Sequence, residues 1–154
     1  MRKLLLICAL LAAAQYSHAQ VPGQFTRNVA DIKGAVVKRE QGAFTDPKTR
    51  QPTGQFVITY IIDTINHELL NASITQKDSR SELIYLYYYV HNRLSKASSG
   101  LVQNGYTQIQ NTYDYDDEDF AIKDKDLDAF SQTEEKYALL KESRRYLAVL
   151  KKSN

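Results

Sequence analysis

Apolar residues recur every three or four positions through much of this chain, which is the spacing of an amphipathic helix. The clearest run comprises Leu83, Tyr87, Val90, Leu94 and Ala97. A Ser-Arg-Ser-Glu sequence precedes it at residues 79–82 and has the form of a capping box, in which a serine and a glutamate satisfy backbone N–H groups at a helix start. The pattern therefore predicts a helix over residues 83–97.

The same spacing predicts three further helices. They cover residues 25–41, residues 101–113 and the chain after residue 134, where a second capping box of sequence Ser-Gln-Thr-Glu comes just before the apolar positions. Residues 42–54 contain two glycines and two prolines and predict a loop. Residues 114–124 predict an exposed acidic loop.

Residues 55–74 give conflicting signals. Between residues 56 and 65 the chain is rich in β-branched and aromatic types, which strands prefer. The polar positions nevertheless step like the stripe of a helix, at Thr59, Asp63, Asn66, His67 and Asn71. Because tertiary context routinely overrides propensity, periodicity favours a helix here.

These elements predict a single all-α domain over residues 20–154, with four to five helices in a bundle-like arrangement. The alternative is an α+β fold with a β-hairpin in residues 34–62 that turns through Asp46-Pro47.

Residues 1–19 have the layout of a secretory signal peptide. A basic head is followed by an unbroken apolar run at residues 4–14, and Ser17 and Ala19 place small side chains at a cleavage site. The run is too short to span a bilayer as a mature helix. We expect a soluble, exported protein, periplasmic or extracellular, whose mature chain begins at Gln20.

Composition narrows the function classes. The single cysteine, Cys8, leaves with the signal peptide, so the mature chain is cysteine-free and has no disulfide. Without Arg2 and Lys3, 18 basic residues balance 18 acidic residues, which argues against nucleic-acid binding. No second apolar run approaches the length of a membrane span. Residues 114–135 are strongly acidic and residues 136–154 basic, so we expect these segments to neutralise each other.

One candidate catalytic cluster emerges from the helical interpretation. If two helices form an antiparallel hairpin with its turn near Gln76, then Asp63, His67 and His91 approach one another. A carboxylate and two imidazoles are suited to metal binding or to acid–base chemistry, as in a hydrolase.

One segment resembles a calcium-binding loop. Residues 124–135 place oxygen-bearing side chains at EF-hand positions, with Asp124, Asp126, Asp128 and Glu135 as the candidate ligands. Ala129 replaces the glycine that the sharp turn of such a loop requires. An acid-rich loop leading into a helix is the favoured interpretation, and no cofactor is expected.

Tyrosine is abundant, with 11 residues in the chain and four of them between residues 85 and 89. Tyr85, Tyr88 and Tyr89 lie off the predicted apolar stripe and are candidates for partner binding, since tyrosine is common at interfaces. With no complete catalytic motif, we expect a binding module for an envelope or extracellular macromolecule, with a protein or glycan partner. A hydrolase using the Asp/His cluster and a calcium-dependent module are the alternatives; whether the protein is an enzyme stays open, as does its oligomeric state.

Overall fold

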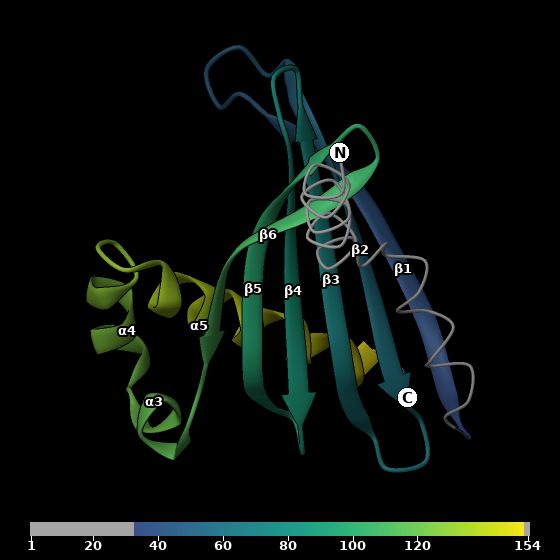
Figure 1. Ribbon diagram of the computed structural model, residues 1–154, viewed down its shortest axis with the longest axis vertical. Coiled ribbons are helices and arrows are strands. Elements are labelled where there is room, and N and C mark those ends of the chain that lie inside the picture. The colour runs from purple at the N-terminus through teal and green to yellow at the C-terminus, as the bar shows by residue number, and fades with distance from the viewer. Residues whose placement is uncertain (1–32, 153–154) are drawn as a thin grey trace, which may run out of the picture.

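Six strands follow one another along the chain and form one antiparallel sheet. The computed structural model describes residues 33–152. The strands are β1 (Ala35–Thr45), β2 (Pro52–Asp63), β3 (Glu68–Asp78), β4 (Glu82–Val90), β5 (Arg93–Gln103) and β6 (Tyr106–Asp114). Each strand pairs with the next, so their order in the sheet is their order in the sequence (Figure 1). The predicted signal peptide and residues 25–32 of the helix predicted over residues 25–41 lie outside the described residues. The prediction of a helix is wrong for the described remainder, because the chain from Ala35 onward forms β1.

Aspartates organise the first three turns in the same way. The carboxylates of Asp46, Asp63 and Asp78 each accept two backbone N–H groups, from the residues two and three positions further along, at 2.7 to 3.1 Å. Such a side chain stands in for a backbone acceptor and reverses the chain locally. These hydrogen bonds hold the pKa of all three carboxyls below the usual range.

The other two turns depend on left-handed backbone. His91 and Asn92 have φ of 49° and 59°, and Asn104 and Gly105 have φ of 53° and 79°. Two consecutive residues with positive φ form the tight turn whose twist matches that of the flanking strands. Asn-Gly is the dipeptide that this turn prefers.

The C-terminal segment supplies a second layer. It contains α3 (Asp117–Ala121), α4 (Asp124–Phe130), α5 (Glu135–Tyr146) and the 3-10 helix η1 (Leu147–Lys152). In Figure 1, α5 crosses behind the middle of the sheet. The core lies between these layers and consists of Tyr60, Ile62, Leu69, Ala72, Ile74, Tyr87, Tyr89, Leu94, Ala97, Leu127, Leu139, Leu140 and Val149.

The prediction of an all-α, bundle-like domain is wrong. Residues 83–97, predicted as one helix, form most of β4, the turn at His91 and Asn92, and the start of β5. Ile84 and Tyr87 lie on opposite faces of β4, and each is only 2% exposed. A strand buried on both faces is apolar at nearly every position, so a helical spacing can always be selected from it.

The helices predicted over residues 101–113 and within residues 55–74 are strands as well. Periodicity was misleading in both, and between residues 56 and 65 strand propensity was the correct signal. The hairpin held as the alternative is present: β1 and β2 pair from Ala35 with Asp63 to Thr45 with Pro52. It is one part of a larger sheet.

The C-terminal helix was predicted correctly, but the capping box predicted to open it at residues 131–134 does not form. α5 begins at Glu135, and its N-cap residue, Glu134, makes no side-chain capping hydrogen bond. The reciprocal capping box found in the structure starts α3 instead, between Asp116 and Asp119. The segment expected to be an acidic loop therefore contains a helix.

The expected neutralisation of the acidic segment by the basic one is confirmed. Lys136 pairs with Asp119 at 2.8 Å and Lys141 pairs with Asp128 at 2.8 Å. The bond from Lys136 to Asp119 raises the pKa of that lysine. These contacts join α3 and α4 to α5, so the opposite charges of the two segments stabilise the packing of these helices.

Among the described residues, none of the helices combines the length and the apolar character needed to cross a membrane.

Candidate functional site

A cavity of about 260 Å³ lies where α5 crosses β3 and β4. We call it the tyrosine groove, and it is lined by Gln76, Tyr85, Tyr87, Glu135, Ala138, Leu139, Glu142 and Tyr146. The sheet contributes the first three of these residues, and α5 contributes the other five. Its lining is aromatic and polar, and its charged members are both glutamates.

Simple periodicities place these side chains. In β4, alternation puts Tyr85, Tyr87 and Tyr89 on the face that α5 covers. In α5, Glu135, Leu139, Glu142 and Tyr146 are spaced by four, three and four residues, which aligns them on one face of the helix. The groove is thus bounded by one face of a strand and one face of a helix.

Tyr87 lies in the interior of the groove. The residues that pair with it on either side, Ala72 and Ala97, are both 0% exposed and leave room for its ring. The ring packs against that of Tyr146, with centroids 5.2 Å apart and the planes inclined by 58°. Tyr87 as a whole is only 2% exposed, and its hydroxyl makes no hydrogen bond with any described residue, although the hydroxyl oxygen itself is not fully enclosed. A hydroxyl that lines a cavity and has no protein partner can donate a hydrogen bond to water or to a ligand there.

Each of the two glutamates accepts hydrogen bonds at one of its two carboxylate oxygens. Oε2 of Glu135 accepts hydrogen bonds from Asn111 Nδ2 and the Tyr113 hydroxyl, both at 2.8 Å. Oε1 of Glu142 accepts one from Arg145 at 2.7 Å. Within the described part of the chain, the second oxygen of each carboxylate accepts no hydrogen bond.

The phenols of the groove stay neutral near neutral pH. Burial, followed by the charge of Glu135, raises the pKa of Tyr85. Burial raises the pKa of Tyr146 to about 12, with a smaller contribution from Glu142. Burial also raises the pKa of Tyr87 far above its ordinary value. The charge of the groove therefore comes from its carboxylates.

The three tyrosines proposed for partner binding occupy three different environments. Tyr85 is half-buried and lines the groove. Tyr89 belongs to the core and donates a hydrogen bond of 3.0 Å to the carbonyl oxygen of Ser143. Tyr88 is half-buried on the opposite face of the sheet. Of the three, only Tyr85 lies at the groove.

The sequence did not single out Gln76, Glu142 or Tyr146. A strand interpretation of residues 82–90 would have grouped Tyr85 with Tyr87. The spacing of Glu135, Glu142 and Tyr146 along the C-terminal helix was visible, but nothing in the sequence paired that face with β4. What the sequence did not show was that α5 packs across β3 and β4.

The predicted cluster of Asp63, His67 and His91 lies at one end of the sheet. Asp63 accepts hydrogen bonds from its own turn, including one of 2.8 Å from Asn66 Nδ2. His91 is exposed and its Nδ1 lies 2.9 Å from Glu68 Oε1, so its partner is a glutamate that the sequence did not indicate. Asn92 bridges the two turns by accepting from the backbone N–H of Leu69 and donating to the carbonyl oxygen of His67. The hydrolase hypothesis stays a prediction.

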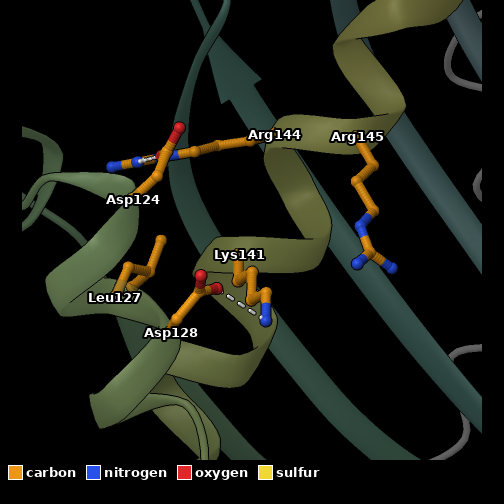
Figure 2. Close-up of a pocket in the computed structure, with 6 residues that line it drawn as sticks. All are labelled: Asp124, Leu127, Asp128, Lys141, Arg144 and Arg145. Atoms are coloured by element: carbon orange, nitrogen blue, oxygen red, sulfur yellow. Dashed lines mark hydrogen bonds and ion pairs between the residues drawn. The ribbon is translucent and has the colours of Figure 1, made fainter.

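The candidate calcium ligands lie on and after α4. Asp124 and Asp128, one helical turn apart, face α5 across a cleft of about 290 Å³ and pair with Arg144 and Lys141 (Figure 2). Leu127 packs between them and is 1% exposed. Glu135 faces β6 instead, through its bonds to Asn111 and Tyr113. In residues 33–152, no group of three or more His, Cys, Asp or Glu side chains is placed to hold a metal ion.

Arg144 makes several of the contacts that hold α3 and α4 against α5. Besides its pair with Asp124, its guanidinium donates to the carbonyl oxygens of Ile122 at 2.9 Å and Phe120 at 3.4 Å. It therefore holds the connection between α3 and α4 against α5. In Figure 2, Arg145 points away from these pairs.

A wider depression of about 580 Å³ adjoins the turn between β4 and β5 and the start of α3. Its cation, Arg93, pairs with Asp117 and lies over the ring of Phe120, 5.6 Å from the centroid.

Comparisons with known proteins add no functional assignment. The chain matches no protein-family model, no curated protein and no solved structure.

Proposed function

We propose that this protein is an exported binding module that holds a group of a partner macromolecule in the tyrosine groove. The observation that carries the proposal is Tyr87, a residue only 2% exposed that lines the cavity and whose hydroxyl makes no hydrogen bond with the described residues. The second carboxylate oxygens of Glu135 and Glu142, to which no described residue donates, add acceptors at the same groove.

Binding accounts for the groove better than catalysis does. Phenols with raised pKa values are poor bases and nucleophiles near neutral pH. Glu135 and Glu142 are seven residues apart on α5, which is about 10 Å along the helix axis. Such a separation exceeds the spacing of about 5 to 9.5 Å typical of catalytic carboxylate pairs in glycoside hydrolases.

Nuclear magnetic resonance tests where small probes bind. A panel of N-acetyl amino-acid amides and methyl glycosides is added to the labelled protein, and backbone amide shifts are followed. We expect the binding members to shift amides of β3, β4 and α5 around the groove. Shifts confined to other surfaces, or none with any probe, would contradict the proposal.

Filling the groove provides a matched control. Ala138→Phe places a ring in the cavity and should weaken probe binding at least tenfold. Ala129→Phe makes the same change on the exposed surface of α4 and should leave binding unchanged. Equal affinity of both variants would mean that the probes bind elsewhere.

Export is tested separately. The signal peptide predicts that mature protein recovered outside the cytoplasm begins at Gln20 or within a few residues of it. N-terminal sequencing measures this directly, and a mature pool that retains Met1 would refute the predicted cleavage.

A further inference from the structure

We propose that the tyrosine groove binds the ammonium or guanidinium group of a basic side chain on a partner protein. This assignment rests on the binding function proposed above and adds the chemical class of the ligand.

Charge is the first argument. The lining residues include two carboxylates and no cationic side chain. Since the three tyrosines remain neutral, nothing within the lining offsets those carboxylates. A cationic ligand gains Coulomb energy that a neutral ligand does not.

Aromatic surface is the second argument. Tyr87 and Tyr146 line the groove beside Glu142, and their rings are inclined by 58°. The face of an aromatic ring carries partial negative charge and attracts cations. Two such rings next to a carboxylate form a site for an alkyl ammonium or a guanidinium, whose methylene groups also contact the rings.

The exposed ion pair between Glu142 and Arg145 is the third argument. Its only cationic neighbour in the described residues is Arg145, whose side chain is 65% exposed. An exposed ion pair of this kind contributes little stability, so an incoming cation can replace Arg145 at small cost. No residue in the described range 33–152 donates to the other carboxylate oxygen of Glu142.

The experiment uses three probes of similar size. Nα-acetyl-lysine N-methylamide carries the cation, Nα-acetyl-norleucine N-methylamide lacks it, and methyl α-glucoside represents a glycan. Each is titrated into the labelled protein while the groove amides are followed. We expect the lysine probe to bind with a dissociation constant on the order of 1 mM, as ligand efficiency predicts for so small a molecule. The other two should bind at least tenfold more weakly.

Two opposing variants sharpen the test. Glu142→Gln should weaken the lysine probe about tenfold, whereas Arg145→Gln should strengthen it, because the competing cation is gone. Glu118→Gln, an exposed change on α3, is the matched control and should have no effect. All variants should retain the parent's melting temperature, which separates loss of binding from loss of fold.

The outcomes distinguish the two proposals. Equal binding of the norleucine probe, or an unchanged affinity in Glu142→Gln, would overturn the cation assignment while leaving a binding groove. Preference for the glucoside would replace the basic side chain with a glycan. Failure of every probe at the groove would overturn the proposed function itself.

Discussion

Replacing Leu94 by alanine should lower the free energy of unfolding by about 2 to 5 kcal/mol, the range for truncating a buried leucine. Leu94 is 1% exposed and belongs to the core between the sheet and the helices. Its removal leaves a cavity that the paired strands on either side cannot close. Urea unfolding followed by circular dichroism measures the change.

Val90→Ala is the control that discriminates between folds. A helix over residues 83–97 would bury Val90 on the same face as Leu94, and both substitutions would then be costly. In the sheet, Val90 ends β4 and is 57% exposed, so its truncation should change stability by less than about 0.5 kcal/mol. Similar losses for the two variants would favour the helix over the sheet.

The turns show how much of the sheet was available in the sequence. Asn104-Gly105 is the strongest short-range signal for a hairpin, and both residues adopt positive φ. The helical interpretation runs through this dipeptide, since it predicts one helix over residues 101–113. Asp46, Asp63 and Asp78 also mark turns, at intervals close to the length of a strand plus its turn. Turn residues at such regular spacing predict strands, and weighing them above periodicity would have given the meander.

The groove could not be predicted in the same way. Tyr85 was identified as a candidate, and Glu135 was identified for calcium binding, a different role. Their meeting depends on α5 crossing β4, a contact between residues about 50 positions apart. Local patterns predict which face of an element is apolar, but they do not specify which two faces pack together. The burial of the Tyr87 ring between β4 and α5 is a consequence of that packing.

Raising the pH above 10 should destabilise the protein steeply. Burial raises the pKa of Tyr87 and of Tyr89 well above their ordinary value near 10. Below pH 10 both tyrosines are protonated in the folded and unfolded states, so they add no pH dependence. Above pH 10 the unfolded chain releases these protons and the folded protein retains them. The free energy of unfolding therefore falls by about 1.4 kcal/mol per pH unit for each tyrosine.

Tyr87→Phe isolates one of these contributions. It removes a hydroxyl that has no hydrogen-bond partner among the described residues, so stability at pH 7 should change little. Above pH 10 its unfolding free energy should fall less steeply than that of the parent, by about 1.4 kcal/mol per pH unit. Tyr106→Phe, at a position 63% exposed, should follow the parent. Urea unfolding at a series of pH values between 8 and 11.5 gives each slope. Identical slopes for Tyr87→Phe and the parent would mean that Tyr87 ionises as readily in the folded protein as in the unfolded chain, and that its ring is not buried between β4 and α5.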